Sequence, residues 1–113
     1  MVKIMKIKIH NDVWKVKLVD ASAKKMNPDP NSYNFGLTEY KELLISIMDG
    51  RSESVTRSTL IHELVHAFLF SYGHTVEGEE AMCDFFGVHG DEIIDLTNQI
   101  MGRWGDRCLQ SKK

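Results

Sequence analysis

Residues 54–72 read SVTRSTLIHELVHAFLFSY, and their apolar side chains recur at helical spacing. The apolar stripe consists of Leu60, Leu64, Val65, Phe68 and Leu69. Repeats at three and four residues predict an amphipathic helix that buries one face. Gly73 follows directly and is a typical residue to end such a helix. We therefore take this segment as the main helix of the fold.

The middle of this helix carries His62-Glu63-Leu64-Val65-His66, the H-E-x-x-H pattern. Histidines four residues apart share one helical face, with Cβ atoms about 6 Å apart, so both imidazoles can reach one ion at about 2.0–2.1 Å. Glu63 points to the side of that face, where it can accept a proton from a metal-bound water. A chance occurrence is the alternative, but unpaired polar groups on a largely buried helix would be costly. The pattern predicts zinc (Zn2+) held by His62 and His66, with Glu63 as general base.

A second helical segment is expected beyond Gly73. Thr75 can cap it, and acidic residues, which are favoured near a helix N-terminus, occupy its first turns at positions 77, 79 and 80. His89-Gly90-Asp91 predicts a break or kink. A last helix is then expected to end near residues 102–105, with an apolar side formed by Ile93, Ile94, Leu96, Ile100 and Met101.

Catalytic zinc usually has three protein ligands and a water, so one more ligand is needed. If the helices on either side of Gly73 run antiparallel, residues equidistant from the turn lie at the same height, because both helices rise about 1.5 Å per residue. Glu80 is then level with His66, and Asp84 is level with His62. We predict Glu80 as the third ligand and Asp84 as the acceptor that fixes the tautomer of His62.

Other residues could also bind the metal. Glu79 is the nearest rival, but position 83, four residues further on, is a cysteine and not an acid. His74 lies close to the expected turn, and the same count of heights places His89 level with residue 57. Cys83 is expected to pack as a small buried hydrophobe. For stabilising an oxyanion the sequence leaves five candidates open: Tyr33, Tyr40, Tyr72, His74 and His89.

Glu80-Ala81-Met82-Cys83-Asp84, following the histidine motif, resembles the gluzincin arrangement of thermolysin-type peptidases. The short interval and the overall size are similar to the minimal zincins of phages and bacteria, of the ImmA/IrrE and SprT-like kind, over residues 36–95. The resemblance implies a zinc metallopeptidase in which residues 43–48 form a sheet edge that pairs with substrate. The longer metzincin pattern is disfavoured, because it requires glycine and histidine where this chain has Leu69 and Tyr72.

The first twenty residues alternate apolar and charged side chains. Lysines at positions 6, 8, 15 and 17 interleave with Ile7, Ile9, Trp14, Val16 and Leu18 around His10-Asn11-Asp12, which predicts a β-hairpin with a lysine face. Residues 24–36 indicate a loop. Residues 43–48 predict a third strand, although a buried helical turn fits their apolar pattern almost as well. We expect one α+β, zincin-like domain over residues 1–113, with a small antiparallel or mixed sheet packed against the motif helix and the helices that follow.

Composition limits the other classes of function. The 113 residues carry a net charge of -2, but residues 1–25 hold seven lysines against two acids, so the remainder is acidic. No apolar run approaches the roughly 20 residues of a membrane span, and the chain is expected to be soluble and cytoplasmic, with Cys83 and Cys108 as free thiols. The expected partner is a peptide or protein substrate, and the oligomeric state is not indicated.

Two alternatives to a peptidase stay open at this stage. The first is a zinc-stabilised binding or regulatory module without turnover. Retention of Glu63 argues against it, because a structural site needs no base. The second is accessory nucleic-acid binding through a lysine face formed by Lys3, Lys6, Lys8, Lys15 and Lys17. A nucleic acid is not the expected main partner, because no aromatic stacking platform is interleaved with these lysines.

Overall fold

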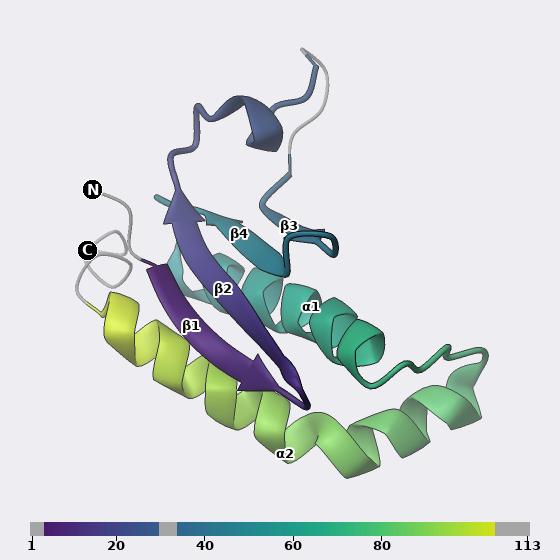
Figure 1. Cartoon of the computed structure of the whole chain (residues 1–113). Coiled ribbons are helices and arrows are strands. Elements are labelled where there is room, and N and C mark those ends of the chain that lie inside the picture. The colour runs from purple at the N-terminus through teal and green to yellow at the C-terminus, as the bar shows by residue number, and fades with distance from the viewer. Residues whose placement is uncertain (1–3, 30–33, 106–113) are drawn as a thin grey trace.

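The computed structural model describes residues 4–29 and 34–105. Its elements, in chain order, are β1 (Ile4–Ile9), β2 (Asp12–Val19), a short 3-10 helix η1 (Lys24–Met26), β3 (Gly36–Glu39), β4 (Leu44–Met48), α1 (Glu53–Ser71) and α2 (Glu79–Trp104). The strands form one mixed sheet, and the two helices run antiparallel to each other against it (Figure 1). The predicted α+β class is therefore confirmed.

The strand order in the sheet is β1-β2-β4-β3. The outer pairs are antiparallel and the central pair, β2 with β4, is parallel. The predicted N-terminal hairpin is confirmed, with Ile7 opposite Trp14 and the turn at His10, whose φ is 56°. The prediction that residues 43–48 form a sheet edge is wrong, because β4 lies between β2 and β3. The edge beside α1 is β3, part of which falls in the predicted loop. Its four residues carry too little alternation to indicate a strand.

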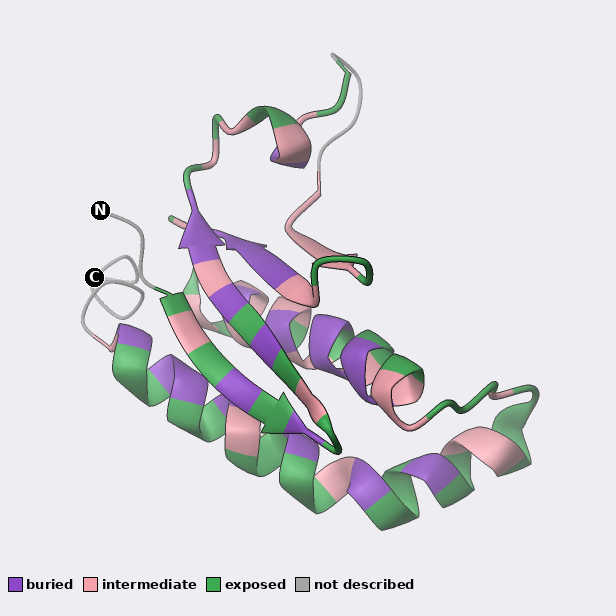
Figure 2. Cartoon of the chain, viewed as in Figure 1, coloured by how far each residue is buried: buried purple, intermediate pink, exposed green. Residues whose placement is uncertain are grey.

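The main core lies between the sheet and the helices. Buried and exposed positions alternate along β1 and β2, as Figure 2 shows, and the buried ones face α1 and α2. Removing such side chains from water contributes about 1.5–3 kcal/mol each relative to leaving them exposed. The core cluster includes Ile9, Trp14, Val16, Ile45, Ile47, Leu60, Leu64, Phe68, Ile93 and Trp104. Lys6, Lys8 and Lys15 lie exposed on the opposite face of the hairpin.

A smaller apolar cluster covers the other face of the sheet at one end. Val19, Met26 and Met48 are buried there beneath the segment around η1. Lys25 Nζ donates to Glu39 Oε1 at 2.7 Å, which ties this segment to β3. At the start of the segment, the backbone N–H and the hydroxyl of Ser22 both donate to Asp20 Oδ1 and lower the pKa of the Asp20 carboxyl.

Helix α1 confirms the prediction for residues 54–72 to within one residue at each end. At its start, the Ser52 hydroxyl accepts a hydrogen bond from the backbone N–H of Val55. At its end, Gly73 takes a φ of 68°, and its N–H donates to the Phe70 carbonyl at 3.1 Å. The next N–H, of His74, donates to the Leu69 carbonyl at 2.8 Å. This pair of bonds is a Schellman motif, which explains why the helix stops at the glycine.

Helix α2 departs from the sequence expectation at two points. It begins at Glu79 after Gly78, so Thr75 does not cap it. It also continues through His89, Gly90 and Asp91, where a break was predicted. Buried positions from Phe85 to Trp104 keep helical spacing across Gly87, Gly90 and Gly102, so packing against the core outweighs the low helix propensity of glycine. Among the described residues, neither helix is apolar enough over its length to cross a membrane.

Ser71 connects the hairpin to the end of α1. Its hydroxyl donates to Asp12 Oδ2 at 2.7 Å and accepts from Trp14 Nε1 at 2.8 Å. Ser71→Ala should lower the free energy of unfolding by about 1–2 kcal/mol, because the buried Trp14 N–H loses its partner. Urea unfolding measures the difference. Ser58→Ala, on the exposed side of the same helix, is the control and should stay within about 0.5 kcal/mol of wild type. Equal losses in the two variants would contradict the assigned role.

Candidate functional site

Glu63 lies on the side of α1 that faces the edge strand β3. Only 7% of its surface is exposed, an unusual degree of burial for a carboxylate. The Thr38 hydroxyl donates to Glu63 Oε1 at 2.6 Å. This short hydrogen bond to a buried acid supplies part of the polar contact that Glu63 loses on leaving water. The carboxylate is therefore held in one orientation beneath the strand.

Gly36 makes the close approach of β3 to α1 possible. A Cβ atom at this position would lie 2.9 Å from both Cγ and Oε2 of Glu63, and 2.6 Å from Cγ2 of Thr59. Real Cβ atoms do not approach other atoms so closely, so any other residue would push the strand and the helix apart. Gly36 and Thr38 together shape the space that the Glu63 carboxylate occupies.

His62 and His66 lie on the exposed side of α1, one turn apart. Their ring centres are 5.0 Å apart and the ring planes cross at 70°. Two imidazoles bound to one tetrahedral zinc ion have ring centres about 5 Å apart, because each nitrogen is about 2.0–2.1 Å from the metal. Neither ring has a hydrogen-bond partner within the described part of the chain. The pair therefore fits two of the coordination positions of such an ion.

Glu80 and Asp84 are exposed on the first turns of α2 and are not brought together with this pair. Within residues 4–29 and 34–105, no three His, Cys, Asp or Glu side chains are close enough to hold one metal ion. The structure thus assembles the histidine pair and Glu63, while Glu80 and Asp84 stay separate from them.

The position of His89 explains this separation. Its ring centre lies 4.4 Å from that of Tyr72 and 5.8 Å from that of Phe68, so His89 is level with the end of α1 and not with residue 57. The expected heights assumed a tight turn at Gly73, but the connection continues to Gly78 before α2 begins. At the helical rise of about 1.5 Å per residue, Glu80 lies roughly 20 Å along the α2 axis from the position on α2 that is level with His66.

The other candidate residues are placed as follows. Cys83 is a free thiol, as predicted, but it is exposed, so the expectation that it packs as a buried hydrophobe is wrong. Cys108 and Tyr33 lie outside the described residues. Tyr72, His74 and His89 cluster at the end of α1. Tyr40 follows β3 and its ring centre lies 5.0 Å from that of Phe70, one turn beyond His66. Phe70 is exposed on the same side of α1 as the two histidines, so Tyr40 lies beside the face of the helix that carries them.

Sequence reasoning did not find Thr38 and Gly36. Both lie in a short strand that lacks a clear alternating pattern. One signal was available, because a glutamate on a largely buried helix requires a donor from a neighbouring element. That requirement calls for a hydroxyl or N–H group without indicating which segment provides it.

Comparison with models of protein families, with curated protein sequences and with solved structures found no match. The interpretation of the site therefore depends on the chemistry of its own residues and on where the fold places them.

Replacing Thr38 tests whether the strand holds the carboxylate. Thr38→Val keeps the shape of the side chain but removes the donor to a buried acid, so the free energy of unfolding should fall by about 2 kcal/mol. Thr38→Ser, which keeps a hydroxyl, is the matched control and should lose less than half of that. Urea unfolding of both variants provides the measurement. If valine and serine cost the same, the hydrogen bond does not stabilise the fold.

Proposed function

We propose that this protein is a zinc-dependent peptidase whose site is centred on α1. One observation carries the proposal. Two imidazoles with a spacing suited to a single ion lie on the exposed side of the helix, and the carboxylate between them in sequence is buried and held by Thr38. A structural metal site has no need of such a carboxylate, because it normally fills its coordination positions with protein ligands.

Glu63 is the proposed general base. Bound zinc would supply a Lewis acid that lowers the pKa of a coordinated water and polarises a peptide carbonyl. Glu63 would take a proton from that water and return it to the leaving amine. Its bond to Thr38 occupies Oε1, which fixes the direction of the remaining oxygen, Oε2, beside Gly36. Fixing the base in this way limits the reorganisation needed during reaction.

The proposed third ligand is Glu80, with Asp84 as the acceptor for the second N–H of His62. Both carboxylates stand apart from the imidazoles, so ligation by Glu80 requires the first turns of α2 to approach α1. This movement would have to displace Val76, Met82 and Phe85, which pack in or against the main core, and Gly78, which provides no side-chain cap, marks where the helix begins. Because zinc ligation by Glu80 requires this movement of α2, a substitution of Glu80 is the most informative test of the third ligand.

The edge strand β3 supports a peptide as the substrate. It pairs with β4 on one side only within the described residues, and its inward positions 36 and 38 contact Glu63. An extended peptide that pairs with this edge would bring its backbone beside the carboxylate, as in strand addition generally. The lysines of the hairpin face away from the helices, on the other side of the sheet from Glu63. This separates any nucleic-acid binding from the proposed reaction. A cytoplasmic location is part of the same proposal.

Zinc content and hydrolysis separate the proposed roles. Purified protein loaded with zinc is expected to hold one equivalent after desalting and to cleave members of a peptide library, with cleavage abolished by a chelator. Glu63→Gln should keep the metal and lose at least about 100-fold in kcat/KM, in the range typical for removing a general base. His62→Ala and His66→Ala should each lose the metal.

Glu80→Gln tests the third ligand, and Glu79→Gln is the matched control on the adjacent residue. The first should lower zinc affinity by at least about tenfold, as loss of a ligating group does. The second should leave the affinity unchanged. Zinc content that is the same in the wild type and in both histidine variants would refute the site. An unchanged affinity in Glu80→Gln alone would refute only the third ligand.

A further inference from the structure

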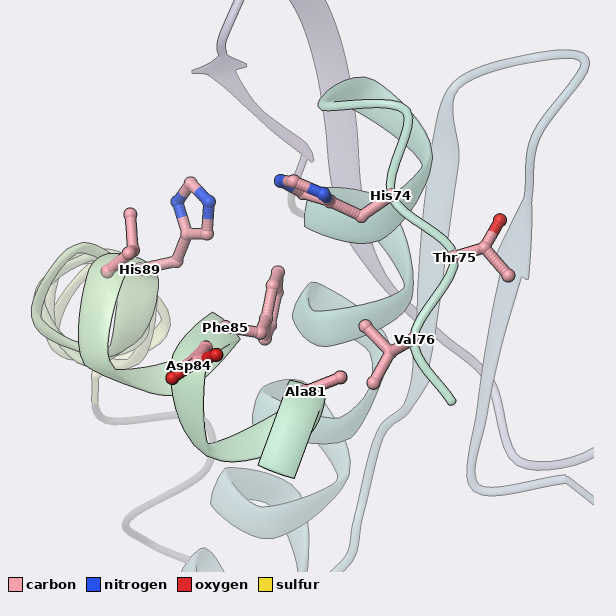
Figure 3. A pocket seen from close by; sticks show the side chains of 8 residues that line it. His74, Thr75, Val76, Ala81, Asp84, Phe85 and His89 are labelled. Atoms are coloured by element: carbon pink, nitrogen blue, oxygen red, sulfur yellow. The ribbon is translucent and has the colours of Figure 1, made fainter. Parts of the chain in front are cut away.

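A cavity lies at the C-terminal end of α1, away from the histidine motif. It is a cleft open to solvent, with a volume of about 330 Å³, lined by residues 74–76 and the first half of α2. Its walls are largely apolar, with Val76, Ala81 and Phe85 among them. In Figure 3 the imidazoles of His74 and His89 project toward the space above Phe85 from opposite sides. Apolar walls with a few convergent polar groups are typical of sites for small ligands.

His89 is the most buried of the polar residues that line the cavity. It is only 7% exposed, and its ring packs between aromatic side chains, with ring centres 4.4 Å from Tyr72 and 5.0 Å from Phe85. No hydrogen-bond partner for its nitrogens exists among the described residues. The ring of His74 lies 5.8 Å away, centre to centre, and also lacks one. His74 is exposed, and the nitrogens of His89 are not among the fully buried unpartnered atoms of the described residues, so both rings have nitrogens open to bond a ligand in the cavity.

Charge determines which ligand fits. The sequence contains no lysine or arginine between Arg57 and Arg103, whereas acidic residues line the surface of α2 and the segment before it. Asp84 lines the cavity itself, and Glu77, Glu79 and Glu80 are exposed close by in sequence. The negative electrostatic potential of these acidic side chains attracts cations and repels anions.

We propose that this cavity binds a primary ammonium group carried on an unbranched apolar stem, the chemistry of a lysine side chain. The ammonium has three donors and no acceptor, so it complements the acceptor nitrogens of His74 and His89. The aromatic ring of Phe85 attracts the same charge, and the stem packs against Val76 and Ala81. The bound cation supplies the hydrogen bond that His89 lacks within the fold.

This inference goes beyond the proposed peptidase function and does not depend on it. Binding is therefore measured by calorimetry with a chelator present throughout, so that no metal contributes. The probes are Nα-acetyl-lysine amide and Nα-acetyl-norleucine amide, which share a four-carbon stem and differ in the terminal ammonium. The lysine compound should bind at least tenfold more tightly. A third probe, n-butylammonium, should also bind, because it retains the ammonium and the stem.

Variants assign the binding to this cavity. His89→Phe and His74→Phe keep ring packing and remove the nitrogens, and each should weaken lysine amide binding at least fivefold. His10→Phe is the control, because His10 stacks on Tyr72 but does not line the cavity. Ala81→Phe fills the space while leaving both imidazoles in place, and it should abolish binding even if His89→Phe fails to fold. Equal affinity for the lysine and norleucine probes, or full binding by Ala81→Phe, would overturn the proposal.

Discussion

The hydrogen bond from Thr38 to Glu63 joins the edge strand β3 to the helix that carries both histidines. A carboxylate that is 7% exposed needs such a donor, since burial of an unpartnered charge would cost several kcal/mol. The strand can supply the donor only because Gly36 leaves room for the glutamate chain. The strand and the helix therefore contact each other closely at Glu63, and this contact fixes the position of the sheet edge relative to α1.

This contact also separates the roles of the motif residues. Core packing of Leu60, Leu64 and Phe68 fixes the rotation of α1, so Glu63 faces β3 while His62 and His66 face solvent. The histidines thus remain accessible to an ion, and the carboxylate remains fixed beside them. The Schellman motif at Gly73 then ends the helix and leads the chain away to Gly78. Asp84 of α2 consequently lies beyond the end of α1, where it lines a cavity with two further histidines.

Local patterns were sufficient to predict much of the fold. The hairpin, the extent of α1 and its glycine stop all follow from spacing and end signals of a few residues. The errors arise where tertiary contacts decide. β3 is too short to show a period, and its partner β4 was taken as the sheet edge. A continuous α2 depends on core contacts that outweigh the low helix propensity of its three glycines. The height of Glu80 relative to His66 depends on the connection between the helices, whose path helical spacing does not determine.

The same distinction applies to the site. The histidine pair and Glu63 were predicted as a unit because they occupy one turn of one helix, where geometry follows from sequence alone. The role of Thr38 depends on which strand pairs beside the helix. The zinc roles of Glu80 and Asp84 remain predictions, since they require contact between two helices that the fold holds apart at these positions.

X-ray absorption spectroscopy at the zinc edge of the protein loaded with one equivalent of metal tests the account most directly. Two imidazole nitrogens should appear at about 2.0–2.1 Å, with the remaining positions filled by oxygen. Glu63→Gln should leave this spectrum unchanged, because Glu63 is not proposed to touch the metal. A spectrum with no imidazole scattering, or one that Glu63→Gln alters as much as His62→Ala does, would contradict the assignment of the histidines as ligands and Glu63 as the base.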